Sequence, residues 1–339
     1  MNVLITGASG FIGSHIARLF AGRHQVTVMA RQGSDLRFLR LKNMRIVRGD
    51  LETPETIAAA VAGQDLIIHA AAKATDWGSY PDFHRVNIEG SLALIDALPA
   101  GARMIHISSN AVLGEEDCTQ PKGVDAQRRP RLPYFLESVF PSAMNHYRIS
   151  KAIAEQLLEK RARTRGISLT IVRPVWVYGP REFHAGPYEY CKTVLSGVPL
   201  MPGIPDNFFH VIFVEDLAKI ILKISESQKA GVHMYNVGHP EVPKMDAYWG
   251  MWCAALGRAK PRLIPEWLIF PIGVFLELLW TAIGLKTPPL FTRARTYMFY
   301  ASNVYDVRKV IDEFDFHDFT PLEYGIRKTV RWWRMNRFL

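Results

Sequence analysis

The sequence predicts an α/β fold: a doubly wound parallel sheet followed by a smaller, mostly helical C-terminal lobe. Short, fully apolar segments alternate with helical periodicity through the first half of the 339 residues. This alternation is typical of a parallel sheet covered by helices on both faces. A glycine-rich turn follows the first apolar segment. The alternation ends near residue 174, beyond which proline, glycine and aromatic residues become frequent.

The expected elements follow in order along the chain. Strands are expected where apolar residues run together, and helices where apolar residues recur every three or four positions. The expected strands are 2–6, 26–30, 44–50, 65–72, 103–109 and 168–174, and the expected helices are 12–21, 55–61, 83–98 and 147–163. Residues 115–145 contain prolines and charges without a period, which predicts a long irregular loop. A strand at 210–214 and a helix at 215–224 indicate a return to the sheet.

This division predicts a sheet domain at 1–174, with its return segment near 208–238, and a second lobe at 175–339.

The composition is that of a folded protein, since 48% of the residues are hydrophobic and 22% are charged. The 3 cysteines and 11 histidines show no spacing typical of a disulfide framework or a metal site, so no metal is expected. The net charge of +9 is compatible with nucleic acid, anionic lipid or a phosphorylated ligand. No helix-turn-helix or aromatic platform supports nucleic acid.

A G-x-x-G-x-x-G turn joins the first expected strand to the first expected helix, with glycines at Gly7, Gly10 and Gly13. Glycines let backbone N–H groups approach a pyrophosphate closely, and the first helical turn, with Phe11 and Ile12, presents its positive dipole end. The strand–turn–helix context favours a Rossmann-type dinucleotide site over an ordinary glycine-rich turn.

The end of the second expected strand bears on which dinucleotide is bound. NAD-specific sites usually carry an acidic residue there, on the ribose 2′-hydroxyl. This strand instead ends in Ala30 and Arg31. Arg31 can pair with a 2′-phosphate, which favours NADP(H). NAD(H) stays open, because the same arginine can face solvent. Asp50, after the third strand, is either an adenine contact or a turn residue.

Tyr147 and Lys151 lie four residues apart, on one face of an expected helix. An ammonium beside a phenol lowers the phenol pKa from about 10 toward neutrality, as a general acid/base near pH 7 requires. Ser108 and Ser109 end the fifth expected strand, where a hydroxyl can hold a substrate carbonyl. The alternative role of these serines is capping of the strand end. The presence of these residues in the same sequence as the glycine turn favours a catalytic role for them.

Together these motifs resemble, in order, those of the extended short-chain dehydrogenase/reductases. The matching segments are TGASGFIGSHIA (6–17), GD (49–50), HAAA (69–72), VNIEGS (86–91), SSNAVLG (108–114), YRISK (147–151) and RPVWVYGPR (173–181). The resemblance implies that Tyr147 is the acid/base, that Lys151 binds the nicotinamide ribose and tunes Tyr147, and that Ser109 polarises the substrate oxygen. It gives Asn87 a structural role. The predicted cofactor-binding residues are Gly7, Gly10, Phe11, Ile12, Gly13, Arg31, Asp50, Leu51, Ala70, Tyr147, Lys151 and Pro174.

Within this family, the chain resembles the 3β-hydroxysteroid dehydrogenase/isomerase-like branch, in segments 72–87 and 200–218. Nucleotide-sugar epimerases typically carry an arginine near position 209 that grips the diphosphate. Here that position is Phe209. A diphosphate would lack its charge-assisted partner there, whereas an apolar ligand would gain from contact with the ring. The alternative is that this phenylalanine belongs to the core.

The last third of the chain carries six of the eight tryptophans and an apolar segment at 267–285. That segment contains Pro271 and Glu277, and clustered basic residues flank it. These features favour insertion into one leaflet over a full span, and the alternative is a buried helix of the second lobe. The tail at 327–339 mixes arginine with tryptophan and is either a second interfacial contact or a solvated helix. No secretory signal is recognised, so we expect a cytoplasmic location, associated at most with the inner face of a membrane. We also expect a homodimer.

These observations predict an NAD(P)-dependent oxidoreductase that interconverts a secondary hydroxyl and a ketone on a sterol-like, steroid-like or other bulky lipid. A carboxylate on the adjacent carbon, such as a 4-carboxylate, would make the oxidised product prone to decarboxylation. One alternative is a nucleotide-sugar epimerase or dehydratase. Another is a non-catalytic NADP-binding scaffold at a membrane.

Overall fold

The computed structural model describes residues 1–39, 43–114, 118–183, 186–227 and 229–339. Its centre is one sheet of seven strands in the order β11-β7-β5-β4-β1-β2-β3, with all neighbours parallel. The strands are β1 (Asn2–Thr6), β2 (Gln25–Ala30), β3 (Met44–Arg48), β4 (Leu66–His69), β5 (Arg103–Ile107), β7 (Ser168–Pro174) and β11 (Val232–Val237). The expected doubly wound parallel sheet is confirmed.

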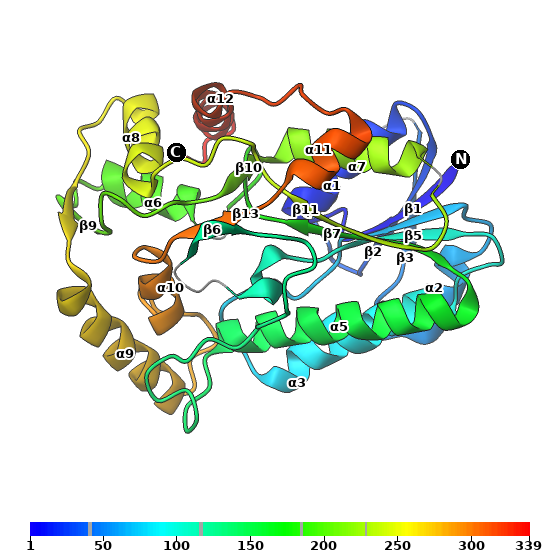
Figure 1. The fold of residues 1–339 in the computed structure, drawn as a ribbon, viewed down its shortest axis with the longest axis horizontal. Coiled ribbons are helices and arrows are strands. Elements are labelled where there is room, and N and C mark those ends of the chain that lie inside the picture. The colour runs from blue at the N-terminus through cyan, green and yellow to red at the C-terminus, as the bar shows by residue number, and fades with distance from the viewer. Residues whose placement is uncertain (40–42, 115–117, 184–185, 228) are drawn as a thin grey trace.

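Helices cover both faces of this sheet (Figure 1). One face carries α1 (Phe11–Ala21), α7 (Val214–Glu226) and α11 (Arg308–Phe314). The other carries α2 (Pro54–Val61), α4 (Gly90–Asp96) and α5 (Ala143–Arg165). Side chains alternate along a strand, so Val3 and Ile5 enter the first core while Leu4 enters the second. The long helix expected at 83–98 is a run of α3 (Tyr80–Phe83), the π-helix η1 (His84–Glu89) and α4.

Two expectations about strands are wrong. The strand expected at 210–214 forms β10 (Val211–Phe213), which pairs with β8 (Trp176–Tyr178) in a separate two-stranded sheet, and the segment 208–238 instead returns to the main sheet through β11. The loop expected to be irregular contains β6 (Cys118–Lys122), paired with β13 (Asn303–Tyr305), while its residues 115–117 lie outside the described chain. Both errors involve partners far away in sequence, which local periodicity does not reveal.

The second lobe is mostly helical and is built around an aromatic core. Its elements are β9 (Leu200–Pro202), β12 (Arg262–Ile264), α6 (Pro187–Leu195), α8 (Met245–Leu256), α9 (Glu266–Ala282), α10 (Arg293–Met298) and α12 (Leu322–Met335). Trp333 on α12 is fully buried and stacks on Trp252 of α8, with ring centroids 5.4 Å apart. The expectation that the tail is solvated or contacts a membrane is therefore wrong for Trp333, because the ring completes this core.

The apolar segment expected at 267–285 forms α9, at the periphery of the molecule (Figure 1). Ile269, Gly273 and Glu277 face inward, and the Glu277 carboxylate is neutralised by Arg293 at 2.8 Å. The opposite face is exposed and apolar, and includes Trp267, Leu268, Ile272, Phe275 and Leu279. Within the described ranges, no helix is long and apolar enough to cross a membrane.

Candidate active site

The glycine turn between β1 and α1 packs so tightly that two of its positions exclude any side chain. A Cβ on Gly13 would lie 2.3 Å from the carbonyl oxygen of Gly7. A Cβ on Gly7, where φ is +72°, would lie 2.5 Å from the backbone nitrogen of Ala71. A Cβ on Gly10 would meet only the Gly7 oxygen, at 3.2 Å, so the space in front of Gly10 is open. The first N–H groups of α1 have no partner within the helix. The turn therefore fits a pyrophosphate.

The predicted adenosine end of the site lies where β2 and β3 finish. Arg31 is exposed, and its carbonyl oxygen accepts a hydrogen bond from Arg48 Nη1 at 2.8 Å. The Asp50 carboxylate accepts the backbone N–H of Glu52 at 3.1 Å, as a turn aspartate does. Leu51 is 8% exposed and belongs to the core. The Arg31 and Asp50 contacts with a cofactor stay predictions.

Two other predicted cofactor-binding residues follow strands of the sheet. Ala70 comes directly after β4, and its backbone closes against Gly7. Pro174 ends β7 beside Val237 of β11. Both lie at the carboxyl edge of the sheet, where ligands of this fold class bind.

Lys151 on α5 is 2% exposed and reaches the end of β5. Its ammonium donates to the carbonyl oxygen of Ile107 at 2.8 Å and lies 3.3 Å from His106 Nε2. Burial lowers the pKa of Lys151 to about 8, against the raising effect of the Glu155 charge. The amine is therefore mostly protonated at pH 7. One of its three protons is left for a further acceptor, such as a ribose hydroxyl.

Ser109 and Tyr147 lie beside this lysine in the fold. Ser109 follows β5 two residues after Ile107, and its Oγ accepts the N–H of Ala111 at 3.2 Å. Capping thus occurs, but it uses only a lone pair, so the hydroxyl proton remains able to donate. Tyr147 is half-buried and lies one turn before Lys151 on α5, which packs against the 3₁₀ turn that Ser109 caps.

A buried chain of hydrogen bonds runs from β1, the strand before the glycine turn, toward α5. The N–H of Ala71 donates to Thr6 Oγ1, which lies 2.8 Å from His69 Nδ1. His69 Nε2 lies 2.9 Å from Ser91 Oγ, which itself donates to the carbonyl oxygen of Asn87. Burial, followed by the charge of Lys151, lowers the pKa of His69 to about 3, so the ring is neutral. These partners assign the ring proton to Nε2.

Asn87 continues this chain to the backbone of Tyr147, the predicted acid/base. Its side-chain amide donates to Ser150 Oγ at 2.9 Å and exchanges hydrogen bonds with the backbone of Lys73. Ser150 Oγ in turn donates to the carbonyl oxygen of Tyr147 at 2.8 Å. Asn87 therefore ties the loop after β4 to α5, which is a positioning role.

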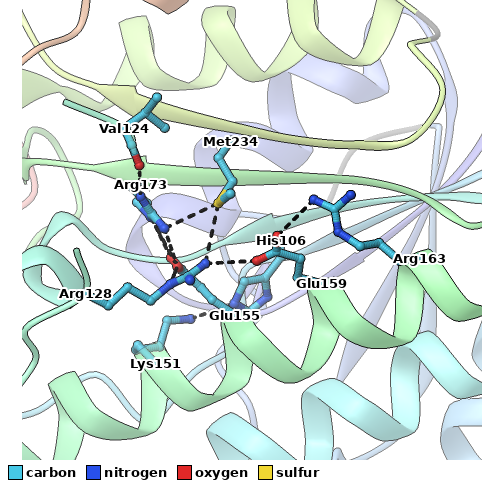
Figure 2. A network of polar contacts seen from close by, with 9 residues as sticks. All are labelled: His106, Val124, Arg128, Lys151, Glu155, Glu159, Arg163, Arg173 and Met234. Carbon is cyan, nitrogen blue, oxygen red and sulfur yellow. Dashed lines mark hydrogen bonds and ion pairs between the residues drawn. The ribbon is translucent and has the colours of Figure 1, made fainter. Parts of the chain in front are cut away.

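One turn after Lys151 on α5, Glu155 belongs to a buried ion cluster that joins α5 to β7 (Figure 2). The Glu155 carboxylate accepts from Arg173 Nη2 at 2.7 Å and Nε at 2.9 Å, and from Arg128 Nε at 2.9 Å. Burial alone would raise the pKa of Glu155, but hydrogen bonding to Arg173 and its charge hold that pKa below its ordinary value. Neither this cluster nor the His69–His106 pair was expected from the sequence. The available signal was a polar side chain inside an otherwise apolar strand.

Phe209 does not form a wall of the site. It is 3% exposed and packs against Trp176, Tyr248 and Trp249. The hypothesis that its ring contacts an apolar ligand is therefore wrong, and the core alternative holds.

The fold and the site together define a dinucleotide-dependent oxidoreductase. The profile of the NAD dependent epimerase/dehydratase family matches residues 3–238, and the chain belongs to this family. It is 26% identical over 336 residues to the 2-alkyl-3-oxoalkanoate reductase of Stenotrophomonas maltophilia (strain K279a), covering 97% of this chain and 98% of that protein. It is 22% identical over 354 residues to 3beta-hydroxysteroid-dehydrogenase/decarboxylase isoform 2 of Arabidopsis thaliana, covering 96% of this chain and 61% of that protein.

Among solved structures, the chain is similar to dTDP-glucose 4,6-dehydratase from Bacillus anthracis str. Ames in complex with NAD. The TM-score is 0.76 at 18% identity, with 100% of this chain and 98% of that chain covered. This likeness establishes the shared fold. The extended short-chain dehydrogenase/reductase resemblance is thereby confirmed at the level of the family and of NAD(P)-dependent oxidoreductase chemistry.

Proposed function

We propose that this protein interconverts a secondary hydroxyl and a ketone on a bulky apolar substrate. The observation that carries the proposal is the position of Lys151, a buried ammonium on α5, one turn after Tyr147, that is anchored on the Ile107 carbonyl oxygen two residues before Ser109. When bound, a nicotinamide dinucleotide supplies the hydride chemistry. The glycine turn would hold its pyrophosphate, and the free proton of Lys151 would hold its ribose.

The residues of the chain then handle the proton. Ser109 donates its hydroxyl proton to the substrate oxygen and orients the carbonyl. Tyr147 gives its phenolic proton to that oxygen during reduction and takes it back during oxidation. The Lys151 ammonium, one turn away on α5, favours the phenolate form of Tyr147.

A substrate that carries a carboxylate on the carbon adjacent to the carbinol carbon suits this chemistry, because its oxidation gives a β-keto acid. The names of two relatives support this class: one is a reductase of 2-alkyl-3-oxoalkanoates, which are β-keto acids, and the other is a hydroxysteroid dehydrogenase/decarboxylase. We therefore propose that the protein belongs to the 3β-hydroxysteroid dehydrogenase-like branch and acts on a sterol-like or other bulky lipid.

A nucleotide-sugar epimerase or dehydratase is the second candidate, favoured by the family and by the shared fold of the dTDP-glucose enzyme. Against it, position 209 carries a buried phenylalanine and so offers no cation to a diphosphate. A non-catalytic scaffold is the third candidate. It leaves the Ser109, Tyr147 and Lys151 arrangement without a role.

The test compares substrates and one matched variant pair. Purified protein is assayed with NADPH or NADH on bulky 2-alkyl-3-oxo acids and sterol ketones, and separately with UDP- and dTDP-sugars. Tyr147→Phe should lower turnover by roughly 10²–10⁴-fold while cofactor affinity stays unchanged, because only the proton donor is lost. Tyr188→Phe, in the second lobe, should retain activity. Turnover of sugars alone, or an active Tyr147→Phe variant, would overturn the proposal.

We also propose that the exposed face of α9 docks on an anionic lipid surface. Of the flanking cations, Arg293 is buried on Glu277 and Arg295 is paired with Asp76, so neither contributes. Exposed cations remain near both ends of α9, at Arg258, Arg262 and Lys286. An exposed apolar face with cations beside it is typical of monotopic binding.

Flotation on anionic vesicles tests this docking. The wild-type protein should bind at low salt and be only partly released at high salt. Replacing three exposed residues with serine, Phe275 and Leu279 on α9 and Ile283 directly after it, should release the protein from the vesicles. Val139→Ser, at an equally exposed apolar position elsewhere, should not. A wild-type protein that fails to bind at low salt would contradict the docking but leave the oxidoreductase proposal intact.

A further inference from the structure

A groove of about 920 Å³ lies between α1, α7 and α12, away from the predicted catalytic residues. Its lining residues come from α1, α7 and α12 and from the loop residues Phe38, Pro180 and Arg181. None of these described residues belongs to the glycine turn or to the Ser109, Tyr147 and Lys151 set. The proposed function therefore leaves this groove without a role.

The groove is strongly cationic, with six arginines and lysines against one carboxylate. Three of these cations form ion pairs: Lys328 with Glu215 at 2.7 Å, Lys219 with Asp318 and Arg327 with Glu323. The other three, Arg18, Arg181 and Arg331, have no carboxylate within ion-pair distance in the described parts of the chain. Like charges gathered without counter-charges destabilise a fold unless an anion joins them.

Arg181 is the strongest pointer to a ligand. Its side chain lies in a residue that is only 8% exposed, and its Nη1 has no hydrogen-bond partner among the described residues. Its Nε lies 3.2 Å from His15 Nε2, which also lies 2.9 Å from the Pro180 carbonyl oxygen. One ring nitrogen carries either a proton or a lone pair, so it satisfies only one of these two neighbours.

The backbone and the charge of Arg181 make this arrangement costly. The residue has φ +72°, in the left-handed region that non-glycine residues rarely adopt. Burial, followed by the charge of Arg18, lowers its pKa to about 10, so the guanidinium stays charged at pH 7. A buried, charged and incompletely hydrogen-bonded group is expensive without a partner of opposite charge.

The groove also has an aromatic part, which lies next to Arg181. Phe38 and Trp332 have ring centroids 5.7 Å apart, and the Arg181 guanidinium carbon lies 5.6 Å from the Phe38 centroid. Leu19 and Met335 extend the apolar surface. The groove thus places guanidinium forks beside a flat apolar surface.

We propose that this groove binds an organic phosphate, with the phosphate on Arg181, Arg18 and Arg331 and its apolar or aromatic part against Phe38 and Trp332. Guanidinium forks match phosphate geometry through paired hydrogen bonds, and the rings cover the organic group. The site does not depend on the proposed function. The same chemistry is offered by a free phosphorylated metabolite and by a lipid headgroup.

Calorimetric titration of the full chain with phenyl phosphate tests the site, with a nicotinamide dinucleotide already saturating its own site. Inorganic phosphate and phenol serve as the two half-ligands. Phenyl phosphate should bind about tenfold more tightly than inorganic phosphate or phenol, because only the whole ligand contacts both the guanidinium groups and the aromatic rings. If the bound dinucleotide abolishes this binding, the groove belongs to the cofactor site and the proposal fails.

Variants assign the binding to the groove. The exposed pair Arg18→Ala and Arg331→Ala, combined, should weaken phenyl phosphate by about tenfold or more, since two charge-assisted contacts are lost. Arg45→Ala removes an exposed arginine on β3 outside the groove and should change affinity by less than about twofold. Arg181→Met should abolish binding while circular dichroism shows the fold retained. If Arg181→Met does not fold, the double variant decides alone.

The source of the phosphate is then distinguished by two probes under the same conditions, AMP and a short-chain phosphatidic acid below its micelle concentration. Tighter binding of AMP indicates a free metabolite, and tighter binding of the phosphatidic acid indicates a lipid headgroup. Either result supports the site if the double variant loses it. Absence of binding at millimolar concentrations, or equal affinity in the double variant, overturns the proposal.

Discussion

Replacing Glu155 with glutamine should destabilise the protein far more than the same change one turn later. Glu155 is fully buried and accepts three short hydrogen bonds from Arg173 and Arg128 (Figure 2). Glutamine keeps the shape but removes the charge, so the buried Arg173 guanidinium loses its counter-charge and keeps only neutral acceptors, such as the Val124 carbonyl oxygen and Met234 Sδ. Breaking a buried ion pair from one side costs about 3–5 kcal/mol. That is a large share of a typical stability of roughly 5–15 kcal/mol.

Urea unfolding of Glu155→Gln and of a matched control measures this cost. The control is Glu159→Gln on the same helix, whose carboxylate is 21% exposed and pairs with Arg128 at 3.2 Å. Partly solvated pairs contribute about 0–1 kcal/mol, so the control should lose little. Because the folded pKa of Glu155 is lowered from its ordinary value of 4.5, the difference from wild type should be full above pH 4.5 and shrink as the pH falls below it. Equal losses in the two variants would refute the reasoning.

Three further predictions concern the cofactor side of the site. Gly13→Ala should lower the free energy of unfolding by about 1–3 kcal/mol and weaken dinucleotide binding, because the new Cβ would meet the Gly7 carbonyl oxygen. Gly22→Ala, at the other end of α1, is the control in the same unfolding and titration assays, because the nearest contact of its new Cβ would be at 3.5 Å. The folded pKa of Lys151 is depressed to about 8, so wild-type stability should rise relative to Lys151→Met between about pH 8 and pH 10.5, with no further change below pH 8; a constant difference across that window in pH-dependent unfolding would contradict this. NADPH should bind more tightly than NADH, and Arg31→Ala should narrow the gap in fluorescence titrations, whereas equal wild-type affinities would remove the basis of the cofactor choice.

The fold was predictable wherever one element carries its own pattern. The strands β1 and β7 lie at the residues that apolar runs predicted, because burial on both faces favours apolar side chains there. The segment at β10 has the same apolar character, but it pairs with β8 outside the main sheet. Periodicity reports burial and not the identity of the partner strand, so pairing had to come from the structure.

The site divides in the same way. Tyr147 and Lys151 share one helix face, and the glycine turn is a single local segment, so spacing alone indicated both. The chain from Thr6 through His69 to Asn87 draws on separate elements, and its hydrogen bonds exist only once those elements pack. A buried histidine in a strand looks, in sequence, like any other polar interruption.

By itself, the sequence determined the sheet architecture, the dinucleotide turn and the Tyr147–Lys151 pair, because each follows from short-range spacing along a strand, turn or helix. Only the tertiary structure decided that Phe209 and Trp333 are core, that Glu155 neutralises Arg173, and that α12 meets α1 to form a cationic groove. These outcomes depend on which surfaces are buried together. A side chain's exposure, its pKa and its partners are set by neighbours from distant parts of the chain.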